Sequence, residues 1–141
     1  MNAKTLNRTL TIKERIRQVR RAELHEAETL VNDAERSVDA EAQREAGAAA
    51  LVTKQGECSA TDLAFRAEQL ERSKQARKRA EADLQQRQEE RENRRGEVGE
   101  ATREVRAIEA LRTRIVTAER HEADKREQRD LDEAAARKKR T

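Results

Sequence analysis

Of the 141 residues, 32 are Lys or Arg and 29 are Asp or Glu, so the formal net charge is only +3. Leu, Ile, Val, Phe and Met supply just 23 side chains, and Trp, Tyr and Pro are absent. A compact domain of this length buries about 70% of the surface of its unfolded chain, which so few apolar side chains cannot achieve. The composition therefore argues against a globular enzyme.

The same composition favours long helices over disorder. Disordered chains combine low hydrophobicity with a high net charge, usually with enrichment in Pro, Ser or Gly, and this chain shows neither property. Good helix formers such as Ala, Glu, Arg, Lys, Gln and Leu dominate, and no Pro interrupts them. We therefore expect an all-α protein made of long amphipathic helices.

The first predicted helix runs from about Thr5 to Thr53. Its apolar residues form two groups, first Leu6, Leu10, Ile12, Ile16 and Val19, then Leu24, Ala27, Val31, Ala34 and Val38. The second group alternates steps of three and four residues, which is the heptad seam of a coiled coil. The step between Val19 and Leu24 is five residues, which predicts a slip in register.

A turn is expected at residues 54–60, before a second helix at about 61–137. Gly56 suits the left-handed conformation that ends many helices. Ser59 and Asp62 have the spacing of residues that cap the start of a helix.

The two segments together predict a long antiparallel coiled-coil hairpin, a single domain over residues 1–141. The acidic segment 23–45 would face the basic cluster at residues 72–79, which favours this pairing. A helix of some 75 residues is roughly 110 Å long, and the first helix reaches only two thirds as far. The second helix should therefore overhang beyond about residue 114.

The middle of the predicted hairpin has two distinctive features. Ile16 and Val19 would fall opposite Gly99 and Gly96, where the absence of a side chain would leave room for a bulky one. Residues 85–97 contain no apolar side chain, which predicts poor packing in that part.

Catalytic and metal-binding patterns are missing from the sequence. There is no GxxxxGK[ST] phosphate loop, and neither His25 nor His121 belongs to an HExxH zinc pattern. No apolar run is long enough to cross a bilayer, and no signal peptide opens the chain. Cys58 is the only cysteine, which suits a reducing compartment. We expect a soluble intracellular protein that is not an enzyme and uses no cofactor or metal.

Phe65, the only aromatic residue, lies near the expected tip of the hairpin. It can plug the tip against Leu51, or it can stand exposed as an anchor for another protein. The sequence favours neither interpretation.

Basic residues gather at both ends of the chain: Lys4, Arg8, Lys13, Arg15, Arg17, Arg20 and Arg21 near the start, and Arg137, Lys138, Lys139 and Arg140 near the end. Such patches can bind nucleic acid. Because the chain has no aromatic platform for bases and intersperses acidic residues elsewhere, we expect no nucleic-acid partner.

Apolar residues gather at the open end of the predicted hairpin, where the first helix runs out: Leu6, Leu10, Ile108, Leu111, Ile115 and Val116. An apolar stripe with no internal partner indicates an external one. We therefore expect a rod whose basic, partly apolar end docks into something larger.

This layout resembles the FliJ/YscO family, the central-stalk proteins of bacterial type III secretion. The resemblance rests on the turn two fifths of the way along the chain and on two segments. These are residues 10–22, with Leu6 before them and Ile12-Lys13, Arg17 and Ala22 within them, and the charged stretch 119–137, which contains Leu-Asp-Glu. It implies a non-enzymatic stalk in the cytoplasm, peripheral to the inner membrane at the secretion apparatus.

The resemblance also implies partners. The open end would enter the pore of a hexameric secretion ATPase through Leu6, Leu10, Lys13, Arg17, Ile115, Glu119, Leu131, Asp132 and Glu133. The tip would contact the cytoplasmic domain of the export gate through Phe65 and Leu70, and secretion chaperones are a further class of partner. A generic coiled-coil scaffold or tether with an unrelated partner is the alternative, and the sequence does not separate a flagellar system from an injectisome.

Overall fold

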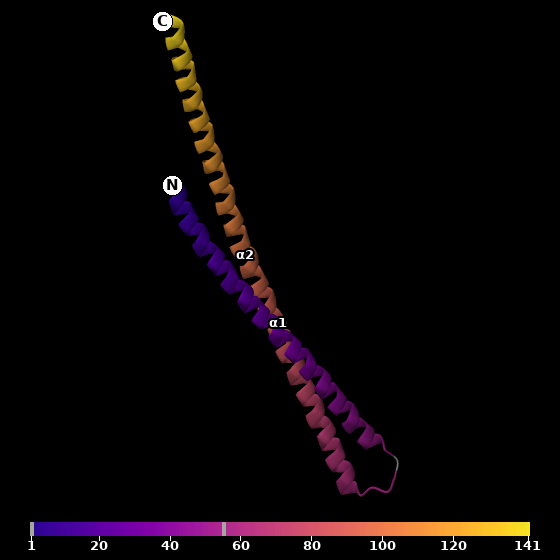
Figure 1. Ribbon diagram of the computed structural model, residues 1–141. Coiled ribbons are helices and arrows are strands. Elements are labelled where there is room, and N and C mark those ends of the chain that lie inside the picture. Colours follow the sequence, from indigo (N-terminus) through magenta and orange to yellow (C-terminus); the bar gives the residue numbers. More distant parts are fainter. Residues whose placement is uncertain (1, 55) are drawn as a thin grey trace. The chain divides into compact units, whose positions relative to one another are not determined.

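The computed structural model describes residues 2–54 and 56–141. It contains two helices, α1 (Ala3–Thr53) and α2 (Ala60–Arg140), and the described residues include no strand (Figure 1). The prediction of an all-α fold with two long helices, the second one overhanging, is confirmed. Both helices extend slightly further than expected, since α1 begins at Ala3 and α2 ends at Arg140.

Side chains cap the starts of both helices. The Asn2 side chain accepts a hydrogen bond from the Thr5 backbone N–H (2.9 Å), and Ser59 Oγ accepts one from the Asp62 N–H (3.1 Å). The capping pattern predicted at Ser59 is therefore confirmed, because the hydroxyl satisfies an amide that has no partner within the helix.

The expected turn at residues 54–60 includes Gln55, which lies outside the described residues. Gly56 has a φ of 158°, far from the value near +57° of the left-handed helical region. The expectation that Gly56 ends α1 in that conformation is therefore wrong.

Burial along α1 follows one unbroken heptad repeat. Every position reached by alternating steps of four and three residues is buried or half-buried: Leu6, Leu10, Lys13, Arg17, Arg20, Leu24, Ala27, Val31, Ala34, Val38, Glu41, Glu45, Ala48 and Val52. These positions are the seam of α1, the row of side chains that faces the other helix of a coiled coil. The predicted slip in register is wrong, because the seam runs through Lys13, Arg17 and Arg20 instead of Ile12, Ile16 and Val19.

The seam of α2 keeps the same spacing but is rich in arginine. Its buried and half-buried positions are Arg66, Leu70, Ser73, Arg77, Ala80, Leu84, Arg87, Arg91, Arg94, Val98, Ala101, Val105 and Ile108. Long side chains can line such a seam because their aliphatic stems pack while their charged ends reach solvent or a carboxylate.

Contacts divide the chain into two compact units. The turn unit comprises residues 20–98, and the terminal unit comprises residues 1–19 together with 99–141. Each unit contains a segment of both helices.

In the turn unit, α1 and α2 run antiparallel. Glu23 of α1 pairs with Arg94 of α2, and Glu45, further along α1, pairs with Arg77, which comes earlier on α2. The second pair joins the acidic and basic segments that the sequence places opposite each other.

The turn unit buries side chains of α1 even where α2 offers few apolar side chains. Val31 is only 1% exposed, and Ala27 and Ala34 are also buried. Arg87 and Arg91 are seam residues between the two interhelical ion pairs, and both are half-buried. Their aliphatic stems can cover the small α1 side chains. A hollow lined in part by Ala27, Glu90 and Arg94 remains between the helices, so the expectation of poor packing at residues 85–97 stays a prediction.

In the terminal unit, the start of α1 packs against α2. Leu6, Leu10, Ala101 and Val105 are buried, and Val105 is 0% exposed. The expectation that Leu6 and Leu10 face water is therefore wrong, because α2 continues far enough to cover them.

The glycines of α2 do not receive side chains from α1. A Cβ atom added to Gly99 would approach only Arg103, at 4.0 Å, and one added to Gly96 would meet no described atom within 4 Å. Ile16 and Val19 are instead exposed, since the seam passes one residue to the side of them.

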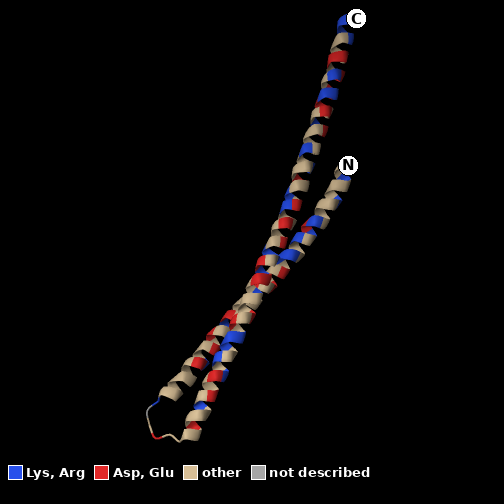
Figure 2. Ribbon diagram, turned by 180° about the vertical axis from the view of Figure 1, so that it is seen from behind, with Lys and Arg blue, Asp and Glu red and all other residues tan. Residues whose placement is uncertain are grey.

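The end of α2 continues past the start of α1, as Figure 1 shows. Every residue from Thr117 to Thr141 is exposed, and we call this segment the overhang. Figure 2 shows basic and acidic residues alternating along it. Its helix is supported by pairs within itself, such as Glu122 with Lys125 (3.2 Å) and Glu133 with Arg137 (3.8 Å).

Candidate partner-binding surfaces

The expected ATPase-contact residues all lie in the terminal unit, but four of them belong to its interior. Leu6 and Leu10 are in the core. Lys13 Nζ lies 2.6 Å from Glu104 Oε2, so it joins the two helices. Arg17 is half-buried in the seam, and its Nε has no hydrogen-bond partner in the described part of the chain. These four side chains hold the helix pair together, and a partner would reach little of their surface.

The other five expected contacts lie on α2 and are more accessible. Ile115 is half-buried, Glu119 is exposed, and Leu131 is 58% exposed. Asp132 accepts a hydrogen bond from Gln128 (3.1 Å), and Glu133 pairs with Arg137. All except Ile115 belong to the overhang, which can be approached from every side.

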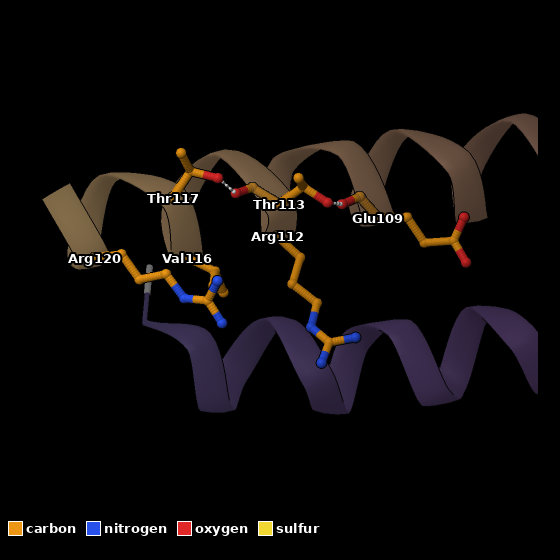
Figure 3. A pocket seen from close by; sticks show the side chains of 6 residues that line it. All are labelled: Glu109, Arg112, Thr113, Val116, Thr117 and Arg120. Carbon is orange, nitrogen blue, oxygen red and sulfur yellow. Dashed lines mark hydrogen bonds between the residues drawn. The ribbon is translucent and has the colours of Figure 1, made fainter.

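An open groove of about 400 Å³ lies on α2 beside the start of α1 (Figure 3). Its lining residues are Glu109, Arg112, Thr113, Val116, Thr117 and Arg120. The Thr113 hydroxyl donates to the Glu109 carbonyl (3.0 Å), and the Thr117 hydroxyl donates to the Thr113 carbonyl (2.8 Å).

The charged groups of this groove are the Glu109 carboxylate and two guanidiniums, so its charge is positive on balance. Figure 3 shows Arg112 and Arg120 extending from α2 toward the α1 helix. Neither forms an ion pair within residues 2–54 and 56–141. A carboxylate is the side-chain group that a pair of guanidiniums binds best, so the groove suits an acidic segment of a partner.

A row of three apolar residues on α1 is exposed, and the sequence reasoning missed it. Ile12, Ile16 and Val19 are 58%, 39% and 56% exposed. The sequence placed them in the seam because they are apolar. The spacing of the heptad repeat could have identified the true seam. Counting back from Leu24 in alternating steps of four and three residues reaches Arg20, not Val19.

At the tip, Phe65 is 61% exposed, and Leu51 and Leu63 are each 51% exposed. The interpretation of Phe65 as a plug against Leu51 is therefore wrong, and the exposed-anchor interpretation fits. Arg66, the neighbouring seam residue, donates to the Leu51 carbonyl (3.1 Å) and so ties the two helix ends together. Leu70, the other expected gate contact, is a half-buried seam residue.

Four charged residues form a closed network in the turn unit. Glu23 Oε2 and Glu97 Oε2 each lie 3.1 Å from Arg94 Nη1. The same two oxygens lie 3.1 and 3.5 Å from Arg20 Nη1. A hydrogen bond to Glu97, with the charges of Glu97 and Glu23, raises the pKa of Arg94 above its ordinary value. We call these residues the ionic square.

Two features are absent from the described residues, a cluster of metal-binding side chains and a membrane-spanning helix. No cluster of three or more His, Cys, Asp or Glu side chains is placed to hold a metal ion there. Neither helix contains, in its described part, a stretch long and apolar enough to cross a bilayer.

These surfaces define a class of protein: a two-helix coiled coil with an exposed helical overhang and several exposed apolar or basic surfaces. The comparison with protein families agrees with that class and identifies one family within it. The model of the family described as flagellar FliJ protein matches residues 2–140, so the chain belongs to the FliJ family. No curated protein and no solved structure matches the chain. Membership implies a role in flagellar type III protein export, in a family of structural stalk proteins.

Proposed function

We propose that the chain is a non-enzymatic central stalk of the flagellar export apparatus, and that its terminal unit enters the ring of the hexameric export ATPase. The observation that carries this proposal is the overhang, in which all residues from Thr117 to Thr141 are exposed. A single exposed helix of this length has no partner within the described chain, yet it is slender enough to enter the centre of a ring.

The groove on α2 supplies the contact chemistry for this proposal. Arg112 and Arg120 present two guanidiniums, unpaired with any described residue, beside the base of the overhang. An acidic segment of one ATPase subunit would bind there, with Leu131 and Asp132 providing further contacts along the overhang. Because the stalk has no sixfold symmetry, it would contact some subunits more closely than others and so favour nucleotide hydrolysis in turn around the ring.

The turn unit would contact the cytoplasmic domain of the export gate. Phe65 is the strongest candidate, because an exposed aromatic side chain is a typical anchor of protein interfaces. Leu70 would support the part of α2 that carries Phe65, since Leu70 is half-buried in the seam. The protein would thus act in the cytoplasm beside the inner membrane, where secretion chaperones are also available as partners.

ATP hydrolysis by the cognate export ATPase tests the ring contact. We expect the full chain to stimulate turnover and Arg112→Glu with Arg120→Glu to lose most of that stimulation, because the double reversal repels a carboxylate. Arg36→Glu with Arg79→Glu is the matched control, since both residues are exposed and lie in the turn unit. No binding and no stimulation by the unaltered chain would contradict the proposal and favour a scaffold with an unrelated partner.

A further inference from the structure

The exposed apolar row on α1 has the spacing of a second coiled-coil seam. Ile12, Ile16 and Val19 are four and three residues apart, and Thr5 and Thr9 continue the same alternation toward the start of the helix. We call Ile12, Ile16 and Val19 the outer row. It precedes the true seam by one residue at every position, which is about 100° around the helix. A helix with two such rows can pack against two other helices at once.

The surroundings of the outer row are basic. Arg8 and Arg15 are four residues before and three residues after Ile12, so they neighbour it on the helix surface. Both are exposed, and neither forms an ion pair within the described part of the chain. On the inner side of α1 the basic residues are paired instead, Lys13 with Glu104 and Arg20 with Glu97.

We propose that the outer row binds one amphipathic helix of another protein, with apolar residues at heptad spacing and acidic residues beside them. This helix would become the third helix of the terminal unit. Its apolar side chains would cover Ile12, Ile16 and Val19, and its carboxylates would pair with Arg8 and Arg15. The surface is separate from the groove between Glu109 and Arg120, so the inference does not depend on the ATPase contact.

A second copy of this chain is a poor occupant. If two outer rows faced each other in parallel, Arg8 and Arg15 of one copy would approach the same arginines of the other, and the like charges would repel. An antiparallel pair centred on Ile16 would still bring the two Arg15 side chains together. The remaining large exposed hydrophobic residues form no comparable row among the described residues: Leu51, Leu63, Phe65, Leu111 and Leu131. A partner with acidic flanks satisfies both the apolar row and its charges.

A designed helical peptide tests this inference with the full-length chain. The probe is a fluorescent peptide of three heptads, about 21 residues, with an Ile and Leu seam flanked by Glu. Two control peptides replace the flanking Glu with Lys or replace the apolar seam with Gln. Binding is measured by fluorescence anisotropy, and circular dichroism confirms that each protein variant stays helical.

We expect only the peptide with both the apolar seam and the Glu flanks to bind. Ile12→Asp with Ile16→Asp should weaken its binding by about tenfold or more. Arg8→Glu with Arg15→Glu should lose the Glu-flanked peptide and gain the Lys-flanked one. Leu51→Asp is the matched control, since Leu51 is 51% exposed and Ile12 is 58% exposed, and it should leave binding unchanged.

Three results would overturn the inference. The Glu-flanked peptide could fail to bind the unaltered chain, or it could bind the Ile12→Asp, Ile16→Asp variant equally well. The third is a stable dimer of the free chain, measured by light scattering, that the same double substitution converts to monomer, since the row would then belong to a second copy.

Discussion

Arg94 Nη1 of α2 lies 3.1 Å from Glu23 Oε2 of α1, and the same nitrogen lies 3.1 Å from Glu97 Oε2. One guanidinium thus joins a carboxylate on its own helix to one on the other helix. Together with Arg20 it closes the ionic square, whose two arginines occupy seam positions that apolar side chains fill in most coiled coils. A polar group in a seam favours the one register in which it finds its partners.

Reversing the charge at Arg94 should destabilise the helix pair. Arg94→Glu would place its new carboxylate beside Glu23 and Glu97, so the urea midpoint should fall. The loss should shrink between low salt and about 1 M salt, because salt screens partly exposed charges. Adding Glu23→Arg should restore part of the midpoint. Equal midpoints for the unaltered and Arg94→Glu proteins at low salt would show that the square contributes nothing.

The stabilisation by Arg94 should not depend on pH across the neutral and alkaline range. A group whose pKa is raised on folding stabilises the fold fully below its unfolded pKa and loses this effect only as the pH rises through its folded pKa. The unfolded pKa of Arg94 already lies far above pH 10, and pairing with Glu97 and Glu23 raises the folded pKa further. The difference in urea midpoint between the unaltered protein and Arg94→Gln should therefore be equal at pH 7 and pH 10. A difference that vanishes by pH 10 would contradict this assignment.

Two valines of the terminal unit distinguish the seam from the outer row. Val105→Ala removes a side chain that is 0% exposed, and it should lower the free energy of unfolding by about 2 kcal/mol. Val19→Ala acts on a side chain that is 56% exposed, and it should change that free energy by less than about 0.5 kcal/mol. Urea denaturation measures both. If Val19→Ala cost as much as Val105→Ala, the seam would have been assigned to the wrong face of α1.

Phe65 should matter for binding but not for stability. Because its side chain is 61% exposed, Phe65→Ala should leave the melting temperature within about 2 °C of the unaltered protein. We expect the same variant to bind the cytoplasmic domain of the export gate at least about tenfold more weakly, measured by calorimetry. Leu111→Ala serves as the control, since Leu111 is also exposed but lies in the terminal unit. Unchanged binding by Phe65→Ala would remove Phe65 from the gate contact.

The sequence was sufficient to predict the two helices and the overhang. The absence of Pro, the abundance of good helix formers and the break around Gly56 determine these features. The register of the first helix could not be read from hydrophobicity alone, because Ile12, Ile16 and Val19 are more apolar than Lys13, Arg17 and Arg20. The basic residues occupy the seam because their spacing continues that of Leu24 to Val38. Glu104 and Glu97 also pair with Lys13 and Arg20 there.

The partner surfaces were harder to predict than the fold. Leu6 and Leu10 looked like docking residues because their apolar stripe was taken to have no partner within the chain, whereas both side chains are buried in the terminal unit. The groove with Arg112 and Arg120 has no sequence motif, since it arises where α1 begins beside a continuing α2. Phe65 was recognised as a candidate, but only the structure shows that it is exposed.

Site-directed crosslinking tests the central claim most directly. Cys58 is the only cysteine, so Cys58→Ser gives a background in which single thiols can be placed at will. Leu131→Cys and Leu63→Cys are comparably exposed positions, at 58% and 51%, in the terminal and turn units. With the export ATPase and the gate domain both present, we predict that a thiol crosslinker joins position 131 to the ATPase and position 63 to the gate domain. Crosslinks in the opposite arrangement, or none from position 131 to the ATPase, would contradict a stalk whose terminal unit enters the ring.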